Sequence, residues 1–138
     1  MKILAIDLGD VRSGVAISDV NEILASPVGT IYEKDKETLL QKILKIIREN
    51  DVQKIVLGLP RNMDGSEGDS AKKARAFGDM LSKQTGLKVV FQDERGTTLE
   101  ATGYLNVSDV RGKKRKKVID SVAATIILQN YLDSKKVD

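Results

Sequence analysis

Acidic residues occur next to apolar segments at three places in this 138-residue sequence. A carboxylate beside a buried segment costs free energy unless it is paired with a cation or a hydrogen-bond donor. Asp7 directly ends the apolar run 3–6, and Asp93 and Glu94 end a second apolar run. Asp120 heads an apolar stripe with helical spacing near the C-terminus. Two carboxylates ~4 Å apart repel by roughly 4 kcal/mol at an effective dielectric constant of about 20, so a cluster of acids indicates a bound cation.

The composition limits which cation and which chemistry these acids could serve. The sequence has no cysteine and no histidine. This excludes disulfides, thiol nucleophiles, catalytic triads that need histidine, and zinc sites built on sulfur or imidazole. Oxygen ligands alone suit Mg²⁺ or Mn²⁺. Two such ions activate a water and stabilise the leaving oxygen of a phosphodiester, so we expect a pair of them.

Each acid also has a simpler interpretation when it is taken alone. Asp7 could cap the turn "DLGD" through backbone amides. Asp120 could be an ordinary acid at a helix N-terminus, where it interacts favourably with the helix dipole. We favour the metal site for Asp7 because a carboxylate on a buried strand is costly unless it is paired.

A basic segment lies directly before Asp120. The net charge of the chain is +3, yet residues 111–117, "RGKKRKK", hold six basic residues and no acid. The rest of the chain carries 17 basic and 20 acidic residues, a net charge of −3. Such a segment attracts a polyanion through counterion release, although it could also be a solvated surface loop. Because the segment adjoins the candidate metal site, we predict that it binds nucleic acid through Lys113, Lys114, Arg115, Lys116 and Lys117.

The hydrophobic pattern predicts the elements that would position these residues. We expect strands over 2–8, 14–19 and 26–32, followed by a helix over 35–49 and a strand over 54–60. Next come a helix with Ala74, Phe77 and Leu81 on one face and a strand over 87–94. A short helix over 97–105 precedes the basic loop, and a last helix follows this loop over 117–132. The short links indicate three antiparallel strands, followed by two strands parallel to the first. The sequence thus predicts an α/β fold with a five-stranded mixed sheet flanked by helices, whose parallel strands direct the acids to one edge.

Length and hydropathy predict a single domain over residues 1–138. The apolar runs are too short to span a membrane, so we expect no membrane partner and a cytoplasmic protein.

Four motifs resemble one family in order and spacing: "DLGDVRSGVA", "GLPRNMDGSEG", "DERGTT" and "KKVIDSVAATIILQNYL". The chain is similar throughout to the YqgF family, also called RuvX, the pre-16S ribosomal RNA nucleases. The resemblance implies an RNase H-like fold related to the RuvC Holliday-junction resolvases. It also implies a divalent-metal nuclease that matures the 5′ end of 16S rRNA. By position, the catalytic and metal-binding acids would be Asp7, Glu94 and Asp120, and Arg12 and Arg95 would contact substrate phosphates or support the structure.

The chain departs from this family pattern at two positions. Val11 stands where the family usually has the first residue of a Lys-Arg pair, and Gly96 stands where it usually has a larger residue. Neither change alters one of the acids, so we expect them to affect substrate affinity and cleavage rate rather than metal binding. Asp93 is left open as a ligand, because side chains alternate along a strand and Asp93 and Glu94 cannot both face the same way.

Other functions remain open at this point. A junction-resolving DNA enzyme would act as a dimer on two symmetric strands, so both monomer and homodimer stay possible. A transcription-associated module could bind nucleic acid without cutting it. The motif "DLG…GVA" also occurs in actin-like ATPases and sugar kinases, but those close two such domains around a nucleotide. Few aromatic residues are present for base stacking, so we expect recognition through backbone, shape or a partner such as the pre-ribosome.

Overall fold

The computed structural model describes residues 1–60, 64–93 and 112–134, and in the last of these ranges it describes side chains from Val122 onward. The short helix expected over 97–105 lies outside these residues. The elements follow the chain in the order β1 (Lys2–Asp7), β2 (Arg12–Ser18), β3 (Ala25–Tyr32), α1 (Lys36–Asn50), β4 (Val52–Leu59), α2 (Asp69–Thr85), β5 (Lys88–Asp93) and α4 (Gly112–Ser134).

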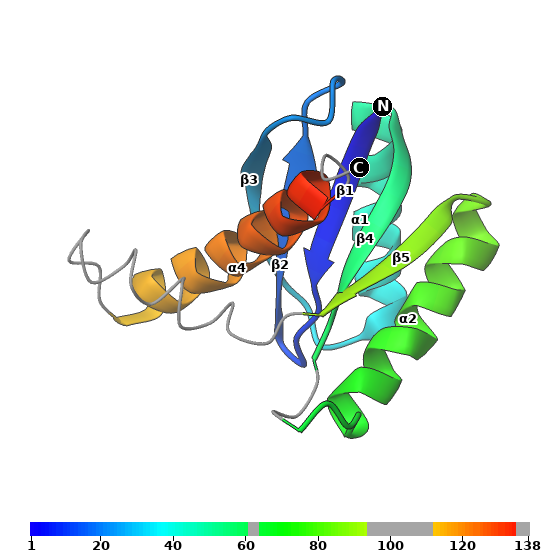
Figure 1. Ribbon diagram of the computed structural model, residues 1–138. Coiled ribbons are helices and arrows are strands. Elements are labelled where there is room, and N and C mark those ends of the chain that lie inside the picture. The colour runs from blue at the N-terminus through cyan, green and yellow to red at the C-terminus, as the bar shows by residue number, and fades with distance from the viewer. Residues whose placement is uncertain (61–63, 94–111, 135–138) are drawn as a thin grey trace.

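The strands form one five-stranded sheet in the order β3-β2-β1-β4-β5 (Figure 1). β1 pairs antiparallel with β2, and β2 pairs antiparallel with β3. β1 pairs parallel with β4, and β4 pairs parallel with β5. The predicted mixed sheet is therefore confirmed, and its strand ends differ from the expected ones by one or two residues.

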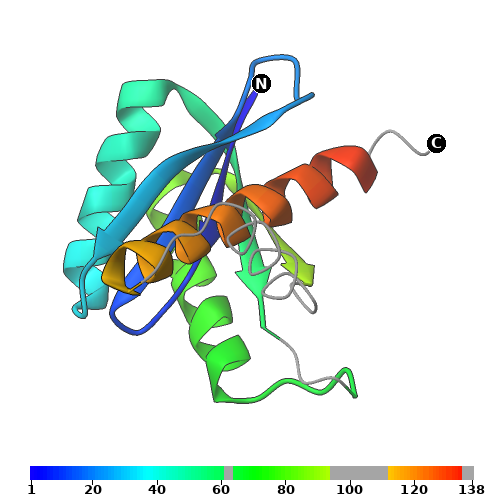
Figure 2. The same cartoon turned by 90° about the vertical axis from the view of Figure 1, so that its left-hand side faces the viewer.

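Helices cover both faces of this sheet (Figures 1 and 2). α1 and α2 pack on one face, where Leu4 and Ile6 of β1 join their buried core. α4 packs on the other face, where Ile3 and Ala5 of β1 meet its apolar stripe. Successive residues of β1 thus point to opposite cores, as strand geometry requires. We call these two sides the α1/α2 face and the α4 face.

The two helices of the α1/α2 face follow the predicted apolar periodicity. The buried stripe of α1 consists of Leu39, Leu40, Ile43, Leu44 and Ile47. Asp35 caps its N-terminus by accepting hydrogen bonds from the Thr38 amide and hydroxyl, at 3.0 and 2.6 Å. The predicted α2 stripe is also buried, with Ala74, Phe77 and Leu81 each at most 2% exposed.

α4 begins earlier than the pattern predicted. The helix starts at Gly112 rather than near Lys117, so the expected basic loop is wrong and residues 113–117 belong to the helix. Lysine and arginine are good helix formers, and the segment contains neither proline nor a β-branched residue. Its predicted core stripe is confirmed, because Ala123, Ala124, Ile127 and Tyr131 are all buried. Within the described ranges, none of the helices combines the length and apolar character of a membrane span.

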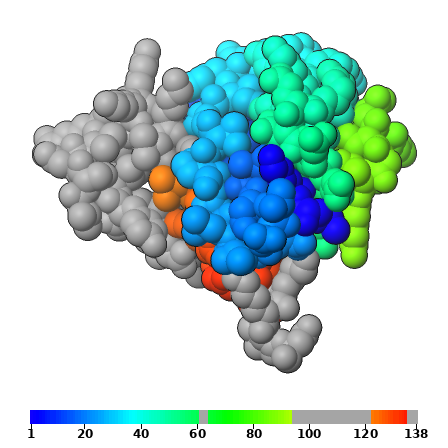
Figure 3. All heavy atoms as spheres, turned by 90° about the horizontal axis from the view of Figure 1, so that it is seen from above, coloured from blue at the N-terminus to red at the C-terminus, as the bar shows by residue number. Residues whose placement is uncertain are grey.

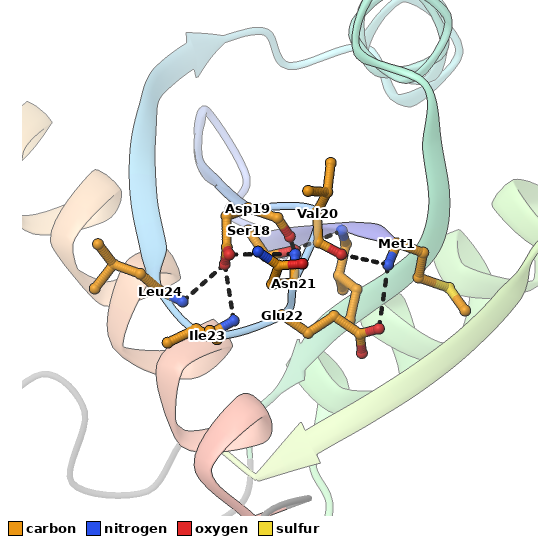
Figure 4. A network of polar contacts seen from close by, with 9 residues as sticks. Met1, Ser18, Asp19, Val20, Asn21, Glu22, Ile23 and Leu24 are labelled. Carbon is orange, nitrogen blue, oxygen red and sulfur yellow. Dashed lines mark hydrogen bonds and ion pairs between the residues drawn. The ribbon is translucent and has the colours of Figure 1, made fainter.

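A hydrogen-bond network closes the hairpin between β2 and β3 (Figure 4). The Asp19 carboxylate accepts hydrogen bonds from the amides of Asn21, Ile23 and Leu24 at 2.8–3.2 Å. These bonds, led by the one from Leu24, lower the pKa of Asp19 below its usual value. The N-terminal ammonium donates to the Val20 carbonyl at 2.7 Å, which ties the start of β1 to the same hairpin (Figure 4). Seen from above, the dark blue N-terminal segment lies against the blue segment that follows it (Figure 3).

Candidate active site

Asp7 and Asp93 end two parallel strands at the same edge of the sheet. Asp7 is the last residue of β1, and Asp93 is the last residue of β5. β4 lies between these strands and is parallel to both. The prediction that strand four lies between the strands that end in Asp7 and Asp93 is therefore confirmed. We call the edge at which these two strands end the carboxyl rim.

The sheet register directs Asp7 to the α4 face. Ile6 belongs to the core on the α1/α2 face, whereas Ala5 belongs to the core on the α4 face. Because side chains alternate along a strand, Asp7 follows Ala5 to the α4 face. Gly14 of β2 is the cross-strand partner of Asp7. Directly opposed residues of two paired strands lie on the same face of the sheet, so position 14 also belongs to the α4 face.

Asp93 points the other way. Val89 and Phe91 of β5 pack against the core on the α1/α2 face, while Val90 packs against the core on the α4 face. By the same alternation, Asp93 lies on the α1/α2 face and Asp7 does not. The residue left open as a ligand is thus placed across the sheet from Asp7. Glu94 and Arg95, and also Gly96, lie outside the described residues.

Arg12 shares the α4 face with Asp7. It is the first residue of β2 and precedes Gly14, the partner of Asp7, by two positions. Residues two apart on a strand lie on one face, so Arg12 belongs to the α4 face at the carboxyl rim. Its side chain is partly exposed there. This geometry brings together two of the residues that the sequence singled out.

α4 crosses this face obliquely, passing over β3 and β2 before its C-terminal end reaches the amino end of β1 (Figure 1). Near its C-terminal end, the ring of Tyr131 lies 5.1 Å from Nζ of Lys54, close to the start of β4. The Gln129 side chain accepts from the Ala25 amide at 2.9 Å and donates to the Ile23 carbonyl at 3.0 Å, at the start of β3. Earlier residues of α4 therefore lie towards the carboxyl rim.

Asp120 lies in this earlier part of α4. It precedes Tyr131 by eleven residues, which correspond to ~16 Å of helix. It also precedes the buried Ala123 and Ala124 by three and four positions, the spacing of one helix face. The side chain of Asp120, like those of Lys113, Lys114, Arg115, Lys116 and Lys117, lies outside the described part of the structure. No group of three potential metal ligands occurs among the described side chains, a set that lacks two of the predicted acids.

The loop after Asp7 is held at several points. The Gly9 amide donates to Oγ of the fully buried Ser13 at 3.2 Å. Nζ of Lys36, at the start of α1, donates to the Gly9 carbonyl at 2.9 Å. The Glu33 amide donates to the Val11 carbonyl at 2.8 Å. The loop thus has identifiable supports in β2, in α1 and in the segment that leads to α1.

Only glycine fits at position 9. A Cβ on Gly9 would lie 2.0 Å from the carbonyl oxygen of Arg12, far inside contact distance. The loop therefore folds back tightly onto the start of β2, and it keeps Asp7 and Arg12 on adjoining strand ends. Sequence reasoning overlooked Ser13 and Lys36 as supports. Ser13 had a signal, since it is a polar residue in an apolar strand, but Lys36 had none.

Solved structures of RuvC and of a viral Holliday junction resolvase share this fold. T. thermophilus RuvC in complex with a Holliday junction substrate aligns with a TM-score of 0.63 at 11% identity, covering 99% of this chain and 96% of that chain. The Fowlpox virus resolvase in complex with its substrate Holliday junction DNA aligns with a TM-score of 0.63 at 12% identity, covering 98% and 99%. The predicted RNase H-like fold is confirmed.

Sequence comparison defines the family. A family model described as "RuvX: Holliday junction resolvase" matches residues 1–134. A protein of Caldanaerobacter subterraneus subsp. tengcongensis named "Putative pre-16S rRNA nuclease" is 48% identical, with 99% of each chain covered. A protein of Carboxydothermus hydrogenoformans with the same name is 44% identical, with 98% of each chain covered. The chain belongs to the RuvX family, and its activity is that of a nuclease.

Proposed function

We propose that this chain is a single-domain, divalent-metal-dependent nuclease that hydrolyses phosphodiester bonds in the 5′ region of precursor 16S rRNA. The observation that carries this proposal is the placement of Asp7 at the end of β1, on the face that α4 covers and beside Arg12. The names of the 48% and 44% identical relatives support the substrate. Such a substrate places the reaction in the cytoplasm.

Asp7, Glu94 and Asp120 would hold the metal. Their donor set consists of oxygens alone, in a chain without histidine or cysteine, and this set fits Mg²⁺ or Mn²⁺. When bound, two such ions supply activation of the attacking water and stabilisation of the leaving oxygen. Asp7 contributes its carboxylate from the rigid end of a buried strand. Asp93 lies on the opposite face and is not part of this ligand set.

Basic residues would hold the substrate backbone beside these acids. Arg12 shares the face of Asp7, and its guanidinium offers paired donors that match a phosphate. Arg95 follows Glu94 directly in the sequence. The basic segment, Lys113, Lys114, Arg115, Lys116 and Lys117, occupies the first turns of the helix that carries Asp120. Together they would bring the phosphates of a strand to the carboxyl rim.

Asp7→Asn tests this proposal with Asp93→Asn as its matched control. Both changes remove one carboxylate from the end of a parallel strand, but on opposite faces. Because outer-sphere substitutions at metal sites already cost roughly 10- to 100-fold, we expect Asp7→Asn to lower metal-dependent cleavage by more than ~100-fold. Asp93→Asn should stay close to wild type. The substrate is a labelled RNA that spans the 5′ precursor of 16S rRNA, assayed with Mg²⁺, Mn²⁺ or EDTA. Equal activity of Asp7→Asn and wild type would overturn the proposal.

A second candidate function is the resolution of Holliday junctions in DNA. It is favoured by the description of the matching family model and by the two resolvases that share the fold. A labelled four-way DNA junction, assayed in parallel, separates the two. Junction cleavage by a homodimer, without cleavage of the RNA, would favour resolution. Cleavage of RNA by a monomer favours precursor processing.

The same assay addresses a binding module without catalysis. For such a module, the wild type and the Asp7→Asn variant would bind RNA with equal affinity. Neither protein would cut the RNA or the DNA junction. If cleavage appears only when pre-ribosomal particles replace the naked RNA, the nuclease needs the particle as its partner. Loss of that cleavage in Asp7→Asn would still assign it to this chain.

A further inference from the structure

A groove lined by lysines lies beside the loop that follows Asp7. Its larger part has a volume of about 430 Å³ and lies between the start of α1, α2 and the loop, with Lys34, Lys36 and Lys73 on its wall. Its smaller part, about 100 Å³, extends along Leu8 and Gly9. The two parts share Asp10, Lys36 and Lys73, so we treat them as one feature, the lysine groove.

The positive charges of Lys36 and Lys73 are only weakly neutralised by the protein groups around them. Nζ of Lys36 donates to neutral carbonyls, those of Gly9 and Asp10, at 2.9 and 3.5 Å. Nζ of Lys73 forms an ion pair with Asp10 at 3.3 Å, and these side chains are 59% and 78% exposed. Such an exposed pair is weak and is readily exchanged for another anion. Asp10 is the only acid that lines the groove within the described residues.

Two of the acids next to these lysines in sequence, Glu33 and Asp35, have other partners. In the segment 33–36, acidic and basic residues alternate. The Glu33 carboxylate accepts from Nζ of Lys42 at 3.0 Å, and this bond lowers the pKa of Glu33. The Asp35 carboxylate caps α1 through Thr38, and this interaction lowers the pKa of Asp35. Lys34 and Lys36 line the groove, so the segment offers it positive charge.

The groove is close to the proposed site of cleavage. Asp10 follows Asp7 by three residues, which span at most ~10 Å of chain. Successive nucleotides of one strand in a DNA duplex rise ~3.4 Å along the helix axis, and a strand with that rise would cover this distance in about three nucleotides. Asp7 points to the α4 face, whereas the groove lies on the side of α1 and α2. A strand bound at Asp7 would therefore reach the groove by crossing the carboxyl rim.

We propose that the lysine groove binds the phosphate backbone of the substrate strand a few nucleotides from the scissile bond, through Lys34 and Lys73. This inference rests on the proposed nuclease function. It extends the nucleic-acid surface to the side of the sheet opposite the basic segment. It also predicts that Asp10 weakens binding, because its carboxylate competes with phosphate for Lys73.

The test compares two double variants in the Asp7→Asn background, so that cleavage does not interfere. The first, Lys34→Ala/Lys73→Ala, removes two positive charges from the groove. Lys45→Ala/Lys83→Ala removes two comparably exposed lysines whose partners, Glu49 and Asp79, lie on the same helices outside the groove. The probe is a fluorescein-labelled single-stranded RNA from the 16S precursor, titrated at several salt concentrations. Thermal unfolding verifies that all variants fold.

We expect the groove variant to bind more weakly and the slope of log affinity against log salt to fall by ~0.7 for each lost phosphate contact. The control variant should change the slope less, and Lys34→Arg/Lys73→Arg should restore it. Asp10→Asn should strengthen binding by ~2- to 5-fold. Equal slopes for the groove and control variants would overturn the inference while leaving cleavage by wild type intact. Absence of RNA binding by every protein, with no cleavage by wild type, would overturn the proposed function as well.

Discussion

Nζ of Lys36 lies 2.9 Å from the carbonyl oxygen of Gly9, so the first residue of α1 holds the loop that follows Asp7. The two residues are 27 positions apart in the sequence. The bond joins the helix layer on one face of the sheet to the strand end that presents the proposed metal ligand. Lys36 is thus a positioning residue for Asp7 rather than a catalytic one.

Lys36→Met should lower kcat by loosening this loop. It removes the ammonium and keeps a side chain of similar length, so the carbonyl of Gly9 loses its donor. A hydrogen bond that involves a charged group contributes about 1.5–3 kcal/mol, and we expect the low end because this site is only partly buried. The measurement combines kcat and KM for RNA cleavage with urea unfolding. Lys34→Met is the control: it lines the same groove without a described bond to the loop, and it should raise KM and leave kcat and stability unchanged. Equal kcat values for the two variants would contradict the positioning role.

Gly9→Ala should damage both stability and cleavage. The new Cβ would meet the Arg12 carbonyl oxygen at 2.0 Å, and this is a backbone atom that cannot rotate away. Overpacking of this kind typically costs about 1–3 kcal/mol, and the shift of the loop would also displace Asp7. The control is Gly68→Ala, because a Cβ at Gly68 meets nothing within 4 Å. Urea unfolding and cleavage of both variants give the comparison. Near wild-type cleavage by Gly9→Ala would show that the loop tolerates movement without loss of the site.

Much of the framework follows from local patterns. The α1 stripe and its Asp35 cap, the antiparallel strands and the parallel crossovers each depend on residues that are close in sequence. The position of Asp7 and Asp93 at one rim follows from strand direction alone. The sequence alone does not predict that Asp7 and Asp93 lie on opposite faces. Alternation shows only that Asp93 and Glu94 cannot share a face. The packing of Val90 and Phe91 in the structure then shows which face Asp93 is on.

Other features depend on contacts or context that a local pattern lacks. The bond from Lys36 to Gly9 joins distant segments, and nothing in "DKETLL" indicates it. The lysine groove likewise arises where α1, α2 and the loop meet. The start of α4 was misjudged for another reason: a dense run of positive charge suggests a solvated loop, although lysine and arginine have high helix propensity.

Acid should destabilise the wild type partly through Asp19. Three backbone amides lower the pKa of this carboxyl in the folded protein, while the unfolded chain has the ordinary value of about 3.9. A lowered folded pKa stabilises the protein above the unfolded pKa, and this contribution is lost as the pH falls through the folded pKa. Asp19→Asn should therefore be less stable at neutral pH and should lose less stability on acidification below about pH 4.

The measurement for Asp19 is the free energy of unfolding in urea, followed from about pH 7 down to about pH 2.5, a range that spans the ordinary aspartate pKa. Asp79→Asn serves as the control, since Asp79 pairs only with Lys83 on the exposed surface of α2 among its described contacts. Its unfolding curves should stay parallel to those of the wild type. Parallel curves for Asp19→Asn as well would show that the hairpin network does not depend on the charge of Asp19.

Lys117→Pro tests where α4 begins and whether the basic segment acts as a helix. If the helix began near Lys117, proline would stand in its first turn, where it is tolerated. With the helix starting at Gly112, residue 117 is interior, and proline removes the hydrogen bond to residue 113 and clashes with its carbonyl, at a cost of ~3 kcal/mol or more. Lys117→Ala is the matched control, since it removes the same charge and favours the helix. We expect Lys117→Pro to bind the precursor RNA more weakly than Lys117→Ala and to show less helical circular dichroism. Indistinguishable binding and spectra would mean that the helix begins near Lys117 in solution and that residues 113–116 hold the substrate without helical structure.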